Sequence, residues 1–185
     1  MIRKIVSIDL LPAEMRAKEF GFEWFPIDDF VHALDETKNV DVLEILVPLV
    51  RRVPDDDTAE SFMQVAQNFE RKKYALQMSG ATVIESPAKR STGDVGEWYY
   101  KQSDDQRLII ATLSLCLRLN PDFLILVAAD GDYAPMVEEL RRQGIRTEVA
   151  APPHMLASDL RRVAWRNHNL DEVFKKIKKI NAVIK

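Results

Sequence analysis

Residues 123–133, FLILVAADGDY, indicate the fold of this 185-residue sequence more directly than any other stretch. Seven apolar residues in a row, 123–129, are typical of a strand that is covered on both faces, as in a parallel sheet. Asp130 ends this strand, and Asp132 follows two residues later, where Gly131 permits a tight turn. In parallel α/β sheets, ligands bind at the edge where the strands end. The stretch therefore predicts a buried strand with an acidic site at its carboxyl end.

Outward from this stretch, strand-type and helix-type segments alternate along the chain, with no internal repeat. This order is typical of an α/β protein with a largely parallel sheet. A polar, glycine-containing loop over 86–103 is long enough to suggest a functional role. Residues 43–53 fit either a helix broken at Pro48 or a strand with an edge proline, and the strand is favoured for the later part. The other strands are expected at 4–9, 81–85 and 147–150, and the helices at 27–37, 58–79, 104–119, 135–143, 158–165 and 170–185.

Length and composition, with 46% hydrophobic and 30% charged residues, fit one domain over 1–185, on which a C-terminal helix over 170–185 packs. No apolar run is long enough to span a membrane, and the N-terminus reaches an acid too soon for a secretory signal. We therefore expect a cytoplasmic protein with no membrane partner. The single cysteine, Cys116, excludes a disulfide framework and a Cys-rich zinc site. The formal net charge of −3 argues against a strongly basic nucleic-acid binder, although local basic patches remain compatible with it.

Several aspartates should gather at one edge of the sheet. They are Asp9, at the end of the first strand, Asp130 and Asp132, and Asp104 or Asp105 at a helix start. Carboxylates that share a site repel one another and raise one another's pKa unless a cation is bound. With no cysteine or paired histidines nearby, oxygen ligands favour Mg²⁺ or Mn²⁺. The other interpretation is that these aspartates are only helix caps and turn residues. The aspartates alone favour neither the metal site nor this interpretation.

The stretch LILVAADGDYAPMVEELRRQGIRTEVAA at 124–151 resembles the signature block of NYN-domain proteins, a branch of the PIN-like nuclease fold. That block is an apolar strand, Ser-Gly-Asp-x-Asp-Phe, an x-Pro, a Leu-Arg-containing helix, Gly and a further strand. Upstream, GATVIESPAKR at 80–90 is similar to the family's Gly-strand-Pro segment. Downstream, ASDLRRVA at 157–164 is similar to its Ser-x-x-Leu-x-x-x-Ala. The resemblance covers roughly 80–164, and includes earlier residues only through the strand that ends at Asp9.

The resemblance implies a three-layer α/β/α sandwich, PIN-like and Rossmann-like, with a mostly parallel central sheet. It also implies metal-dependent cleavage of RNA in the active members of the family. Matched position by position, the catalytic and metal-ligating candidates are Asp9, Asp105, Asp130 and Asp132. In the implied mechanism, a bound ion and a carboxylate position a water for in-line attack on phosphorus.

The sequence departs from the family pattern at several of these places. The Gly and Asn that usually follow the first aspartate are replaced by Leu10, Leu11 and Pro12. A second acid of the helix that Asp105 opens falls on Ala111, next to Thr112, and the Ser-Gly before the aspartate pair is Ala128–Ala129. A further acid, expected beyond 158–164, falls on Trp165. These changes would weaken metal binding or abolish turnover.

Basic and aromatic residues of the long loop, together with one helix start, are candidates for RNA contacts. Their alternative roles are a solvated surface, aromatics that pin the loop to the core, and, for Ser158, a helix cap. The candidates are Lys89, Arg90, Trp98, Lys101 and Ser158.

Three functions remain open. The first is a metal-dependent ribonuclease, an endonuclease that hydrolyses phosphodiester bonds of single-stranded or structured RNA with Mg²⁺ or Mn²⁺. The second is a catalytically degenerate PIN-like domain that binds RNA or a protein partner. The missing acid at Ala111 favours this function. The sequence also leaves a homo-oligomer open. The third takes 130–132 as the Asp-x-Asp of a nucleotide-sugar transferase. It is weaker, because 185 residues leave little room for an acceptor region and no Gly-rich phosphate loop is present.

Overall fold

The computed structural model describes residues 1–34, 39–54, 56, 58–87, 89–92, 98–101 and 103–184, with backbone alone at 89–92, 98–101 and 183–184. Six strands form one sheet in the order β3-β2-β1-β6-β7-β8. Every neighbouring pair in this sheet is parallel. The strands are β1 (Ile2–Ile8), β2 (Val40–Arg51), β3 (Thr82–Pro87), β6 (Phe123–Val127), β7 (Arg146–Ala151) and β8 (Arg166–Asn169).

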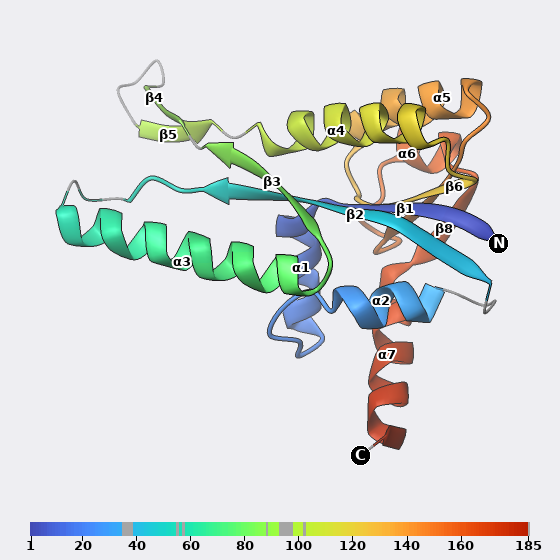
Figure 1. Ribbon diagram of the computed structural model, residues 1–185, viewed down its shortest axis with the longest axis horizontal. Helices are drawn as coiled ribbons and strands as arrows, with labels where there is room; N and C mark the ends of the chain where they lie inside the picture. The colour runs from blue at the N-terminus through green and yellow to red at the C-terminus, as the bar shows by residue number, and fades with distance from the viewer. Residues whose placement is uncertain are drawn as a thin grey trace.

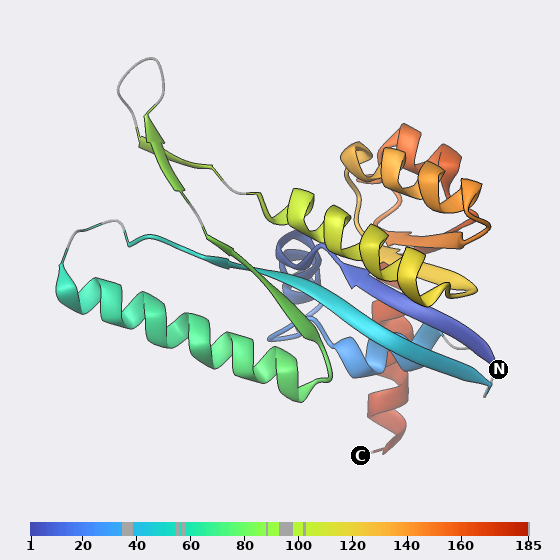
Figure 2. The ribbon, with the colours of Figure 1, turned by 45° about the horizontal axis from the view of Figure 1, so that its top comes forward.

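Helices cover both faces of this sheet (Figure 1). On one face lie α4 (Asp104–Leu119), α5 (Ala134–Arg142) and α6 (Ser158–Val163). On the other lie α1 (Leu10–Glu19), α2 (Ile27–Leu34), α3 (Ala59–Met78) and α7 (Leu170–Ile184). In the view turned by 45°, α3 runs beside β2 and β3 and lies away from α5 and α6 (Figure 2). The α/β class and the three-layer arrangement expected from the sequence are confirmed.

Two hydrophobic clusters, one on each face of the sheet, explain the unbroken apolar run of β6. Leu124 and Leu126 belong to the cluster under α4, α5 and α6. Ile125 and Val127 belong to the cluster that contains residues of α1, α2, α3 and α7. Because successive side chains of a strand point to opposite faces, a strand covered on both sides needs apolar residues at every position.

Strand β2 contains residues 43–51, whereas 52 and 53 lie outside it. The strand interpretation is therefore right for most of 43–53, and β2 begins earlier, at Val40. Pro48 is tolerated in it because the pairing of β1 with β2 ends at Ser7 and Leu46. Beyond that point β2 is paired with β3 alone, so the backbone N–H that proline lacks is not required on both sides.

The expectation of a plain loop over 86–103 is wrong. Two short strands, β4 (Lys89–Thr92) and β5 (Trp98–Lys101), pair antiparallel within it. Helix α1, strand β8 and the short 3₁₀ helix η1 (Gly131–Tyr133) were also not expected. Gly131 is not among the residues with positive φ, so the turn does not depend on glycine's backbone freedom.

The helix expected over 58–79 is present, but its predicted apolar face is only partly covered. Phe69 and Leu76 are buried, whereas Phe62 is 47% exposed. Thr58 is the N-cap, and its side chain accepts a hydrogen bond from the Ser61 N–H at 3.3 Å.

The first half of α7 packs on the sheet. Its buried residues are Leu170, Val173, Phe174 and Ile177. Asn169 caps the helix, since its Oδ1 accepts a hydrogen bond from the Asp171 N–H at 3.0 Å. Among the described residues, no helix combines the length and apolar character that crossing a membrane requires.

Two buried threonines should respond in opposite directions to replacement by valine. The hydroxyl of Thr112 lies 2.7 Å from that of Ser7, whereas the hydroxyl of Thr147 is buried without a hydrogen-bond partner in the described part of the chain. Thr147→Val should raise the free energy of unfolding by about 1 kcal/mol, and Thr112→Val should lower it by about 1–3 kcal/mol. Urea denaturation of both variants checks this, and changes of the same sign would contradict it.

Candidate functional site

Asp9 lies at the carboxyl edge of the sheet, one residue past β1. Its backbone N–H donates to the Val127 carbonyl at 2.9 Å, which continues the β1–β6 pairing to the last residue of β6. The side chain is partly buried. Burial and the neighbouring carboxylates, in the order Asp104, Asp105 and Asp130, raise its pKa to about 7 from an ordinary 3.8. The clustering of charge expected from the sequence is therefore present around Asp9.

Asp104 and Asp105 are the first two residues of α4. Both are partly buried, and burial raises the pKa of Asp104, with a smaller contribution from the charge of Asp105. The sequence left open which of the two joins the site. The structure brings both near enough to Asp9 to raise its pKa.

Asp130 and Asp132 occupy different parts of the turn after β6. The Asp130 Oδ1 accepts a hydrogen bond from the Asp132 N–H at 3.0 Å, so Asp130 caps η1, as the alternative interpretation expected. Asp130 also faces Asp9 closely enough to raise its pKa. Asp132 is exposed and is not among the charges that raise the Asp9 pKa. The structure thus groups Asp9, Asp104, Asp105 and Asp130, and places Asp132 at the solvent side of the turn.

Tyr133 belongs to this site, although nothing in the sequence reasoning singled it out. It is 1% exposed, and its hydroxyl makes no hydrogen bond of normal geometry within the described residues. Burial and the negative charges of Asp9, Asp105 and Asp104 raise its pKa. The signal in the sequence that could have identified it is a tyrosine at the position where the family block has phenylalanine. This tyrosine adds a phenol beside Asp9.

Below Asp9, the contact between β1 and α4 is neutral. Thr112 is fully buried and pairs with Ser7, which is likewise fully buried, at 2.7 Å. Ala111, where the family places an acid, is partly buried against the hydrophobic cluster under α4. A carboxylate is therefore absent from this position, and the polar pair beside it carries no charge.

The donors around Asp9 fit a hard divalent cation by their chemistry. Carboxylate oxygens are the ligands that Mg²⁺ and Mn²⁺ prefer, and a cation would relieve the repulsion that raises the Asp9 pKa. Within the described ranges, no three His, Cys, Asp or Glu side chains are placed to hold one ion together.

The residues predicted to contact RNA are only partly described. Lys89, Arg90, Trp98 and Lys101 lie on the paired strands β4 and β5, and their side chains lie outside the described part. Ser158 is exposed as the first residue of α6, whose N-cap is Ala157. The helix-cap interpretation of Ser158 is therefore wrong, because no side chain caps this helix.

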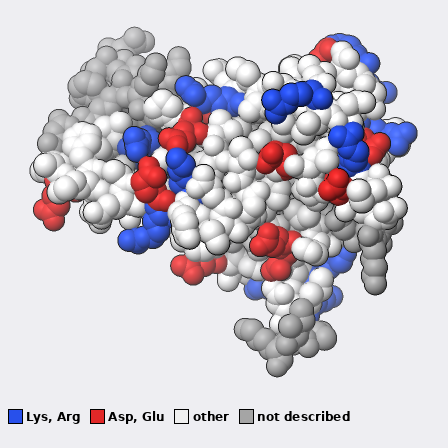
Figure 3. Space-filling view, in the orientation of Figure 1, with Lys and Arg blue, Asp and Glu red and all other residues white. Residues whose placement is uncertain are grey.

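Acidic and basic side chains are interspersed on the face seen in Figure 3. This face has no broad surface of one sign, in keeping with the formal net charge of −3. Attraction of a polyanion to this face would therefore depend on particular cations rather than on a general positive field.

Comparisons with known proteins agree with the fold described above. The NYN domain family profile matches residues 58–171. This family consists of PIN-like nucleases, which generally use divalent metal ions. A crystal structure of a protein of unknown function from Vibrio parahaemolyticus RIMD 2210633 superposes with a TM-score of 0.65 at 18% identity. The match covers 94% of this chain and 95% of that one, and shows a common fold. A search of curated proteins gives no significant match.

Proposed function

The chain belongs to the NYN domain family, and we propose that it is an endoribonuclease that hydrolyses RNA phosphodiester bonds with a bound Mg²⁺ or Mn²⁺. One observation carries the proposal: the pKa of Asp9 is raised to about 7 by burial and by three carboxylates from two other segments. Such a concentration of negative charge is unfavourable by itself and becomes favourable when a cation is bound.

In the proposed mechanism, Asp9, Asp105, Asp130 and Asp132 would hold the ion, one or two of them directly and the others through its bound waters, and would position the water that attacks phosphorus. When bound, the ion supplies an activated water and neutralises charge that develops on the phosphate. Asp130 is oriented by its bond to the Asp132 N–H, which keeps its second oxygen available. Asp132, which is exposed, would contact the ion through water. Asp9 would hold the ion in its ionised form, which in the metal-free protein becomes less populated as the pH falls below about 7.

The RNA contacts that we propose come from the β4–β5 segment and from the start of α6. They are Lys89, Arg90, Trp98, Lys101 and Ser158. We further propose that residues 1–185 act as one domain in the cytoplasm. A second candidate function, a degenerate domain that binds RNA or a protein partner, is favoured by one observation: the position of the missing acid is occupied by Ala111 beside a neutral Ser7–Thr112 pair.

The test is cleavage of end-labelled single-stranded RNA with Mg²⁺, with Mn²⁺ and with EDTA, using the protein and its Asp130→Asn variant. We expect cleavage that requires the ion and disappears in the variant. Asp28→Asn is the matched control, because Asp28 is an exposed carboxylate in the first turn of α2. Absence of cleavage with both ions, in protein shown to be folded, would contradict the enzyme and favour the binding domain. Mn²⁺ binding without RNA cleavage would favour the degenerate domain or a transferase.

A further inference from the structure

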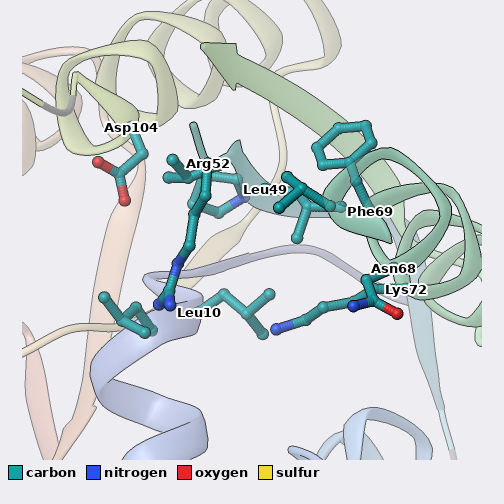
Figure 4. Close-up of a pocket in the computed structure, with 11 residues that line it drawn as sticks. Leu10, Leu49, Arg52, Asn68, Phe69, Lys72 and Asp104 are labelled. Carbon is teal, nitrogen blue, oxygen red and sulfur yellow. The ribbon is translucent and has the colours of Figure 1, made fainter. Parts of the chain in front are cut away.

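A pocket of about 390 Å³ opens beside the acidic site, between α1, α3 and the end of β2 (Figure 4). Its volume lies within the range of pockets that hold small organic ligands, about 300–1,000 Å³. Asp104 lines it as well as facing Asp9, so the pocket and the acidic site share a wall. A chain bound across the carboxylates would therefore pass directly over the pocket.

Most of the pocket wall is apolar. It is formed by Leu10 and Leu11 at the start of α1, by Pro48, Leu49 and Val50 of β2, and by Val65 and Phe69 of α3. Leu10 and Leu11 stand where the family usually has Gly and Asn, so in this chain two large side chains line the pocket directly after the first aspartate. Such a wall suits the flat apolar face of a nucleobase, and Asn68 adds one amide that can both donate and accept at a base edge.

Two cations of the pocket have different roles. Lys72 donates to the Glu14 Oε2 at 2.6 Å, and it lies 5.7 Å from the centre of the Trp24 ring. It thereby ties α3 to α1 and is neutralised. Arg52 extends toward Leu10 across the pocket (Figure 4), and the described residues include no hydrogen-bond or ion-pair partner for it. A guanidinium in this position is suited to a phosphate, which it can bind through two parallel N–H groups.

We infer that this pocket binds one nucleotide of single-stranded RNA, next to the phosphate that is cleaved. The base lies against the apolar wall, and Arg52 binds its phosphate. Because a base must leave its stack to enter the pocket, paired RNA is excluded from it. The inference rests on the proposed function where it puts the bound nucleotide next to the cleaved phosphate. Binding of the nucleotide in the pocket itself needs no metal ion.

Binding is measured by fluorescence anisotropy of a labelled single-stranded RNA octamer in EDTA at fixed salt. Arg52→Gln should weaken binding at least about tenfold, as expected for loss of a charge-assisted hydrogen bond to phosphate. Arg51→Gln is the matched control, because Arg51 is the neighbouring arginine but is paired with Glu70 at 3.4 Å and lies over Phe69. It should change affinity by less than about twofold. Equal losses in both variants would overturn the inference, since only net charge would then matter.

A second pair of variants tests the pocket without changing charge. Asn68→Trp fills it and should also weaken binding at least about tenfold, whereas Gln67→Trp, on the exposed surface of α3, should not. Thermal denaturation confirms folding of each variant. Unchanged binding by Asn68→Trp would overturn the inference, even if the protein cleaves RNA. Loss of binding in Arg52→Gln and Asn68→Trp, with no cleavage by the unaltered protein, would support the pocket and contradict the nuclease.

Discussion

Asp9→Asn is expected to stabilise the metal-free protein at pH 8 by up to about 4 kcal/mol, because a pKa near 7 against 3.8 in the unfolded chain corresponds to that free energy. Below pH 3.8 the carboxyl is protonated in both states and contributes nothing. As the pH rises from there to 7, the unfolded chain releases the proton while the folded protein retains it, so the unaltered protein loses stability. Above pH 7 the loss is complete. Asparagine has no such titration.

The measurement is urea denaturation in EDTA at pH 5 and pH 8. The difference between Asp9→Asn and the unaltered protein should be about 2.5 kcal/mol smaller at pH 5. Asp28→Asn, at an exposed position in α2, should change stability by less than about 0.5 kcal/mol at either pH. A difference that does not vary with pH would show that Asp9 titrates normally in the folded protein.

The proposed metal site adds an expectation for the same variants. A cation that binds only the folded state raises the free energy of unfolding. At pH 8, Mg²⁺ should therefore stabilise the unaltered protein more than Asp9→Asn. Equal stabilisation of the two would argue against Asp9 as a metal ligand.

Phe174→Ala is expected to lower the free energy of unfolding by about 3–5 kcal/mol, the usual range for a fully buried phenylalanine. Its ring lies among three others, with centroid distances of 5.3 Å to Phe20, 5.4 Å to Phe22 and 5.9 Å to Phe25. These rings join the segment after α1 to α7. The cavity left by Phe174→Ala therefore cannot close unless that segment or α7 moves. Arg16 also links α1 to α7, since it donates to both carboxylate oxygens of Asp171 at 2.8 and 2.6 Å.

Urea denaturation measures the loss, and hydrogen exchange should show faster opening of α7. Ile180→Ala is the matched control on the same helix, because Ile180 is 44% exposed and should cost less than about 1 kcal/mol. Similar losses in the two variants would mean that α7 is not held by the aromatic cluster.

The elements that the sequence predicted well are those whose signal is local. Strand β6 is apolar at every position, and α4 begins at its acidic residues and ends at Asn120, whose φ of 46° is typical of a helix end. Helix α1 was missed because its buried face consists of Leu10, Ala13, Glu14 and Ala17. Two small residues and an acid among these four weaken the apolar periodicity by which a helix is recognised. Strands β4 and β5 were missed because four-residue strands without apolar alternation have almost no periodic signal.

The sequence by itself determined that this is an α/β protein and that aspartates follow two of its strands, because both depend on residues close together in the chain. Tertiary structure alone decided that β1 lies beside β6, which brings Asp9 to Asp130 across 120 intervening positions. It also decided that the phenol of Tyr133 is buried beside Asp9, and that α1 and α3 enclose a pocket sharing Asp104 with the acidic site. Strand order, burial and the pKa values that follow from them depend on contacts between distant segments, and no local pattern of residues encodes those contacts.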